Sequence, residues 1–77
     1  MQDIDIEIQK RIHRDPEILG GKPVVRGTRI PVYVIIESFG NGCTEAEIVN
    51  DFPDLAVEDV RAALAYYVRV MAEPISA

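Results

Sequence analysis

The segment GGKPVVRGTRIPV, residues 20–32, decides how the rest of the chain is interpreted. It holds three glycines, two prolines and three basic residues between two apolar segments. Gly20 and Gly21 permit backbone conformations that other residues resist. Gly27 interrupts a β-branched run, which is typical of a bulge or a tight bend in a strand. The segment therefore predicts a short β-hairpin.

Other interpretations of this segment carry different functions. A phosphate-binding loop is disfavoured, because Lys22 is followed by proline and a β-branched run, not by Ser or Thr and a helix. A basic arm for nucleic acid stays open, since Lys22, Arg26 and Arg29 alternate with residues that pack. We favour a structural hairpin in which Arg29 pairs with a carboxylate such as Glu37 or Asp51.

The first residues of the chain show two overlapping patterns. Ile4, Ile6 and Ile8 alternate with acidic residues, which is the period of a half-buried strand. Ile8 and Ile12 also fall on one face of a helix. We favour the strand, so that residues 1–31 form a β-arm.

Helical signals begin after Pro31. Proline suits the first position of a helix, and the glycines of residues 40–42 end it. Thr44 and Glu47 form a capping box for a second helix, and Pro53 closes that helix. The side chains expected to face inward on these two helices are Val32, Ile35, Ile36, Phe39, Ile48, Val49 and Phe52.

A third helix is predicted from about residue 57 to 72. Its expected apolar stripe consists of Val57, Val60, Leu64, Tyr67, Val68 and Met71. A short helix, a tight connection and a longer helix give a helix-turn-helix layout. The fold class is therefore mainly α, a short N-terminal β-hairpin followed by three helices, in a single domain of residues 1–77 whose helical part is residues 32–77.

Composition excludes several classes of protein. The 77 residues provide one core, and no apolar run is long enough to span a membrane. Without a signal-peptide pattern, we expect the protein in the cytoplasm. One cysteine, Cys43, and one histidine, His13, make neither a disulfide nor a zinc site. No serine or carboxylate constellation indicates catalysis, so we expect no enzyme activity, no metal, no cofactor and no small-molecule substrate.

Charge is unevenly distributed along the chain. The net charge is −5, yet residues 1–31 contain six Lys and Arg against five acids, whereas residues 32–77 contain two against eight. A polyanion would meet repulsion over most of the helical half.

Candidate DNA contacts lie in two groups. Arg61, Tyr66 and Arg69 belong to the third helix, which would be the recognition helix. The other group is the N-terminal cluster Lys10, Arg11 and Arg14. The leading turn of the third helix, however, offers Glu58 and Asp59, which suit the helix dipole and oppose a DNA backbone.

Several of these blocks resemble a known family. The elements DPEILGGKPVVRGTRIPV and TEAEIVNDFPDLAVEDVRAALAYY, within about residues 12–67, are similar to the bacterial domain-of-unknown-function family 433. The specific part is residues 20–23 and 27–32. The chain departs from the family pattern at Ala56, where Thr or Ser is frequent and a helix cap worth about 1 kcal/mol is lost, and at Phe52, where Tyr is frequent.

The resemblance implies a homeodomain-like or winged-helix-like domain that acts as the antitoxin of a type II toxin–antitoxin pair. Its partners would be a PIN-like ribonuclease toxin and its own operator DNA. A stand-alone helix-turn-helix transcriptional regulator is the alternative.

Two surfaces are candidates for protein partners. Open strand edges of the hairpin predict a homodimer or toxin interface, and its candidate residues are Lys22, Val24, Val25, Arg26, Thr28 and Arg29. An acidic helical exterior would complement the basic entrance of a ribonuclease, although a solvated exterior explains it equally well. The acids concerned are Glu45, Glu47, Asp51, Asp54, Glu58 and Asp59.

Overall fold

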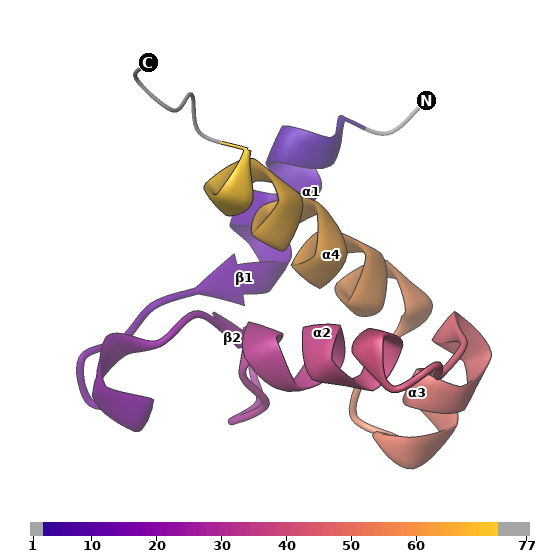
Figure 1. Ribbon diagram of the computed structural model, residues 1–77. Helices are drawn as coiled ribbons and strands as arrows, with labels where there is room; N and C mark the ends of the chain where they lie inside the picture. The colour runs from indigo at the N-terminus through magenta and orange to yellow at the C-terminus, as the bar shows by residue number, and fades with distance from the viewer. Residues whose placement is uncertain (1–2, 73–77) are drawn as a thin grey trace.

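The computed structural model describes residues 3–72 and contains four α-helices and one two-stranded antiparallel hairpin (Figure 1). In chain order the elements are α1 (Ile4–Arg11), β1 (Ile12–His13), a 3-10 turn (Leu19–Gly21), β2 (Val24–Val25), α2 (Val32–Gly40), α3 (Glu45–Asp51) and α4 (Val57–Met71). Helices α1, α2 and α3 all pack against α4. The mainly helical fold with a short hairpin is confirmed.

The strand predicted near the N-terminus is wrong, because residues 4–11 form α1. Asp3 caps this helix, its Oδ1 accepting a hydrogen bond from the Asp5 N–H at 2.9 Å. Acids in the first turn and Lys10 and Arg11 in the last turn complement the helix dipole. Of the three alternating isoleucines, Ile4 and Ile6 are exposed and Ile8 packs against the core. The N-terminal part is thus a helix followed by a hairpin, not a β-arm.

A short hairpin with glycines at its bends is present as predicted, but the segment of residues 20–32 supplies only β2, and its partner strand β1 lies at Ile12–His13. Ile12 pairs with Val25 and His13 with Val24. Gly20 and Gly27 have positive φ values of 67° and 82°, conformations that glycine adopts without a Cβ penalty. The far side of β2 is also occupied, because the Val25 N–H donates to the Ile30 carbonyl and the Val32 N–H to the Pro23 carbonyl.

The two predicted central helices are confirmed. Pro31 is the N-cap of α2, whose Val32 and Ile35 are buried. Thr44 and Glu47 form the capping box of α3, with Thr44 N–H to Glu47 Oε1 at 2.8 Å and Glu47 N–H to Thr44 Oγ1 at 3.1 Å. The inward positions of both helices are buried or packed against the core.

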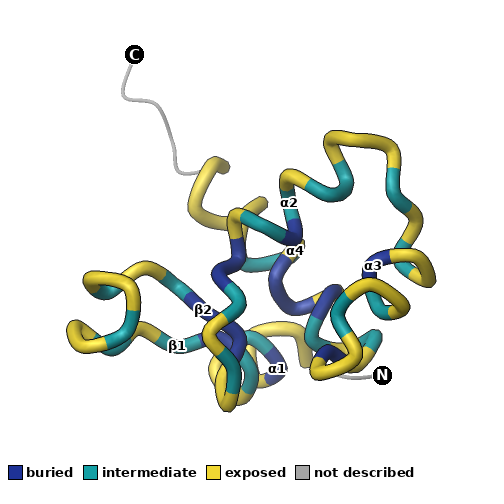
Figure 2. Tube along the Cα trace, turned by 90° about the horizontal axis from the view of Figure 1, so that it is seen from below, coloured by how far each residue is buried: buried dark blue, intermediate teal, exposed yellow. Residues whose placement is uncertain are grey.

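The core lies between α4 and the elements around it (Figure 2). The core joins the hairpin to the helices, since both strands and each of the helices α2, α3 and α4 contribute residues to it. The buried members are Ile12, Val25, Val32, Ile35, Ile48, Leu55, Val60, Ala62 and Ala63.

The expected apolar stripe of α4 is only partly correct. Val60 is fully buried, but Leu64, Tyr67, Val68 and Met71 are 39–65% exposed. In their place, the small side chains Ala62 and Ala63 face the core. Alanine lets neighbouring helices approach closely, so α4 buries an alanine face and leaves larger apolar side chains outside.

Candidate protein-binding site

The cations of the predicted recognition helix are bound to carboxylates within the molecule. Arg61 makes a bidentate pair with Glu45 of α3, with Nε to Oε2 at 2.9 Å and Nη2 to Oε1 at 3.0 Å. This pair lowers the pKa of Glu45 and raises the pKa of Arg61. Arg69 pairs with Asp5 of α1. A phosphate approaching α4 would therefore compete with carboxylates that already hold both arginines.

Two further DNA candidates, Arg11 and Lys10, lie in the last turn of α1. Arg11 donates from Nε to Glu7 Oε1 at 2.9 Å and from Nη1 to Asp59 Oδ1 at 3.0 Å, so it connects α1 with the start of α4. The hydrogen bond from Arg11 is the main cause that holds the pKa of the buried Glu7 below its usual range. Lys10 lies 3.5 Å from the same carboxylate. Arg11 thus stabilises the packing of α1 against α4, whereas Lys10 forms its ion pair within α1.

Asp59 has a second role at the start of α4. Its Oδ2 accepts the Ala56 N–H at 2.9 Å, in a helix whose N-cap side chain makes no hydrogen bond. The missing cap oxygen at Ala56 is therefore compensated in part from within the first turn.

The predicted hairpin interface is largely internal. Val24 and Val25 are 0% and 1% exposed, so their prediction as partner contacts is wrong. Thr28 holds the turn, its hydroxyl donating to the Val25 carbonyl at 2.8 Å and accepting the Ile30 N–H at 3.0 Å. These side chains shape the hairpin because the small domain needs its β-branched residues for its own core.

Arg26 satisfies the C-terminal end of α1. Its Nε donates to the Lys10 carbonyl at 2.9 Å and its Nη2 to the Gln9 carbonyl at 3.2 Å. Carbonyl groups in the last turn of a helix have no partner inside the helix, so an arginine across the hairpin is a suitable donor. Arg26 is therefore a structural residue of the junction between α1 and β2.

Arg29 differs from the other arginines. Among the described residues it forms no ion pair, so the predicted pairing with Glu37 or Asp51 is wrong. It is exposed and lies beside an open cleft that His13 and Asp54 also line.

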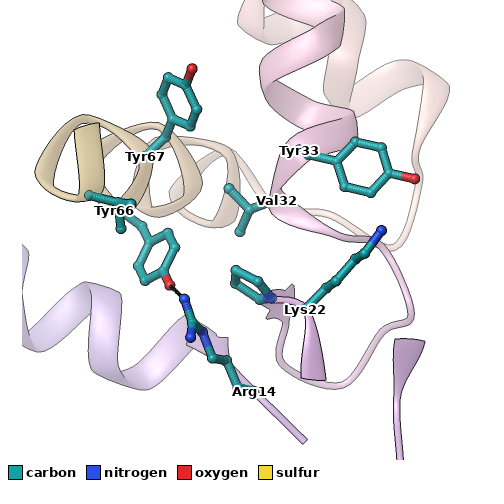
Figure 3. Close-up of a pocket in the computed structure, with 8 residues that line it drawn as sticks. Arg14, Lys22, Val32, Tyr33, Tyr66 and Tyr67 are labelled. Carbon is teal, nitrogen blue, oxygen red and sulfur yellow. Dashed lines mark hydrogen bonds between the residues drawn. The ribbon is translucent and has the colours of Figure 1, made fainter. Parts of the chain in front are cut away.

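A pocket of about 380 Å³ lies between the hairpin, the start of α2 and the second half of α4 (Figure 3). We call it the tyrosine pocket. Its lining residues are Arg14, Lys22, Pro23, Val32, Tyr33, Tyr66, Tyr67 and Val70. Three aromatic rings and three apolar side chains give it the character of a site for an apolar group.

Two cations stand at this pocket. Arg14 Nη2 donates to the Tyr66 hydroxyl at 2.7 Å, so two residues predicted separately as DNA contacts come together here. Lys22 Nζ lies 5.2 Å from the centroid of the Tyr33 ring. Neither cation forms an ion pair with a carboxylate of residues 3–72. The arrangement is suited to an apolar side chain that carries or neighbours a carboxylate.

Sequence reasoning missed Tyr33 and Val70 as surface residues. Tyr33 does not fit the spacing of the buried positions of α2, and this mismatch in the sequence indicated that its side chain is exposed. The neighbouring rings from α4 are brought to it only by the tertiary fold.

The acidic half presents a second, chemically opposite surface. Glu37, Glu47, Asp51, Asp54 and Glu58 are exposed, and none of them forms an ion pair with another described residue. We call these five residues the acidic face. Glu45 and Asp59, predicted to belong to it, are instead engaged by Arg61 and Arg11.

The fold and these surfaces define a small, mainly helical domain with a short hairpin. The family model described as "Protein of unknown function (DUF433)" matches residues 12–67. The chain belongs to this family, and the resemblance found in its sequence is confirmed.

Two relatives have been compared with the chain. The uncharacterized protein y4eO of Sinorhizobium fredii (strain NBRC 101917 / NGR234) is 45% identical over 51 residues, which are 66% of this chain and 23% of that protein. The crystal structure of a DUF433 member from Anabaena variabilis ATCC 29413 superimposes with a TM-score of 0.74 at 32% identity, over 84% of this chain and 64% of that one. The chain thus spans about a quarter of the length of the curated relative.

Within residues 3–72, α4 is the longest helix and no helix combines the length and apolar character needed to cross a membrane. In the same range, no group of three or more His, Cys, Asp or Glu residues is placed to hold a metal ion.

Proposed function

We propose that this protein is a non-catalytic, cytoplasmic antitoxin that binds a PIN-like ribonuclease. The observation that carries the proposal is that most described acids of the helical half form no ion pair with another described residue, whereas most of the cations are held by groups of the same chain. Among residues 3–72, the five carboxylates of the acidic face form no ion pair, and Glu47 accepts only the capping hydrogen bond from Thr44, whereas five of the eight Lys and Arg residues are held by carboxylates or carbonyls of the same chain.

A ribonuclease must attract RNA, so the entrance to its active site is expected to be basic. An acidic face complements such an entrance, speeds association and excludes the RNA. Arg29 offers a further contact on the hairpin, because it is exposed and forms no ion pair with any of residues 3–72, and such an arginine suits the acidic metal site of a nuclease.

The internal pairing of Arg61 and Arg69 disfavours a stand-alone DNA-binding regulator. To reach a phosphate, Arg61 would have to leave a bidentate carboxylate, and Glu58 would oppose the approach. Operator binding, if the antitoxin performs it, requires cations supplied by the toxin or by Arg14, Lys22 and Arg29.

The central experiment first looks for a PIN-like reading frame beside this gene and then measures whether the chain inhibits the ribonuclease that it encodes. The wild-type chain is expected to form a complex and to abolish RNA cleavage at a stoichiometric ratio. Absence of both a complex and inhibition at micromolar concentrations would overturn the proposal.

A matched pair of variants tests the acidic face. Asp51→Asn with Glu58→Gln removes two charges from this face, and Asp15→Asn with Glu17→Gln removes two from the hairpin loop. We expect the first pair to slow association by about tenfold at low ionic strength, with the difference shrinking in high salt, and the second pair to have little effect. Equal rates for the two double variants would contradict the role of the acidic face.

DNA binding is tested separately by gel shift on the protein's own promoter at two salt concentrations. We expect the chain alone to give no retardation. A specific, strongly salt-dependent shift by the chain alone would instead favour the regulator.

A further inference from the structure

The second half of α4 carries an apolar surface that the monomer does not use. Leu64, Tyr67, Val68 and Met71 are 40%, 39%, 54% and 65% exposed. Their spacing of i, i+3, i+4 and i+7 places them on one face of the helix. We call these four residues the α4 stripe.

The α4 stripe lies beside the covered face of the same helix. Helices α1, α2 and α3 all pack against α4, and Val60 in its first half is fully buried. Beyond residue 63 the stripe has no comparable cover from the described residues. A contiguous apolar patch on a small protein marks an interaction site.

We propose that the α4 stripe is the interface at which two copies of this chain form a homodimer, with their α4 helices packed antiparallel about a two-fold axis. The stripe is symmetric about a point between Tyr67 and Val68. Around this axis, Leu64 of one copy faces Met71 of the other, which is the self-complementary contact that a two-fold interface requires. Antiparallel helices with this spacing pack as in helical bundles.

Charge favours a second copy as the occupant. Residues 62–72 contain one charged side chain, Arg69, and it is paired with Asp5 of α1. The stripe itself is uncharged, so a copy with the same net charge of −5 meets no like charge at the centre of the contact. A basic partner would gain nothing here, since the free carboxylates lie on the acidic face.

The α4 stripe, together with Val70, supplies about two thirds of the area that a small dimer interface needs. At their observed exposures, the four side chains with Val70 beside them present on the order of 400 Å² per copy. Two copies therefore bury about 800 Å², and a rim that includes the exposed Tyr33 is needed to reach the ~1,200 Å² of small specific interfaces. The interface predicted at the hairpin lacks such a surface, because β2 is paired on both sides and its valines are buried.

Sedimentation equilibrium and light scattering test the proposal. The wild-type chain is expected at about twice 8.6 kDa at micromolar concentrations and to dissociate on dilution. Val68→Glu places two like charges beside each other across the two-fold axis, next to apolar side chains of the other copy, and is expected to weaken dimerisation at least about tenfold. Its circular dichroism is expected to stay helical, because Val68 is exposed.

A control and a rescue make the result specific. Ile6→Glu makes the same kind of change at an α1 residue with the same 54% exposure, and it is expected to leave the dimer intact. Mixing Val68→Glu with Val68→Lys is expected to restore a dimer of one copy of each. A wild-type chain that remains near 8.6 kDa at all concentrations, or a dimer insensitive to Val68→Glu, would overturn the proposal, and so would the loss of the dimer in Ile6→Glu.

Discussion

Asp59 and Glu58 are adjacent acids in the first turn of α4, and the structure predicts that they contribute differently to the stability of the fold. Asp59 accepts the Ala56 N–H and the Arg11 guanidinium, and its side chain is 14% exposed. Glu58 is exposed and forms no ion pair with a described residue. Replacing each residue by alanine therefore distinguishes the hydrogen bonds of Asp59, which join α1 to α4, from the general interaction of an acid with the helix dipole.

The expected cost of Asp59→Ala follows from the two lost interactions. A charge-assisted hydrogen bond contributes about 1.5–3 kcal/mol, at the low end here because Arg11 keeps its bond to Glu7. The capping bond to the Ala56 N–H adds about 0.5–1 kcal/mol. Together they predict a loss of about 2–3 kcal/mol from a total of roughly 4–12 kcal/mol for a chain of this length. Glu58→Ala loses only a dipole interaction of about 0.3–1 kcal/mol.

Thermal and urea unfolding at pH 7 and one fixed protein concentration measure both variants. For a domain of this size, Asp59→Ala is expected to lower Tm by about 10–20 °C. Asp59→Asn keeps an oxygen for the Ala56 N–H and weakens the bond to Arg11, so its Tm should lie between those of the wild type and Asp59→Ala. If the free energies of unfolding of Asp59→Ala and Glu58→Ala differ by less than about 0.5 kcal/mol, the reasoning is refuted.

Three further predictions concern pH, backbone and packing. The pKa of Glu7 is lowered in the folded state, so the ionised side chain stabilises the fold above the ordinary glutamate pKa of about 4.3, and this contribution is lost as pH falls below that value. In urea unfolding, the difference in free energy of unfolding between wild type and Glu7→Gln should therefore shrink from pH 6 to pH 3. Gly27→Ala should lower the free energy of unfolding by about 1 kcal/mol, because φ at this residue is 82°. Gly40→Ala, at the helical end of α2, should raise the free energy of unfolding by up to about 1 kcal/mol. Thermal melts in which both variants change stability in the same direction would contradict this prediction. Ile35→Val, at a position with no exposure, should lower stability by about 0.5–1.5 kcal/mol, and an unchanged Tm would argue against its burial.

The location of residues 4–8 shows where a local pattern was insufficient. Alternation of Ile4, Ile6 and Ile8 suggested a strand, but the cap at Asp3 and the pairing of Glu7 with Arg11 stabilise a helix. Arg11 is held in turn by Asp59, 48 residues further on. The helix is therefore stabilised by two local contacts and by one long-range contact that the pattern of isoleucines does not show.

The sequence by itself determined the features that depend on neighbours along the chain. The capping box of Thr44 and Glu47, the start of α2 at Pro31 and the bend at Gly27 each follow from local backbone sterics and hydrogen bonding. Only the tertiary structure decided which face of α4 is buried, because periodicity marks apolar positions without saying which of them another element covers. Close packing selected the small Ala62 and Ala63 for the core and left Leu64 and Met71 outside, and the same packing gathered Tyr33, Tyr66 and Tyr67 around one pocket.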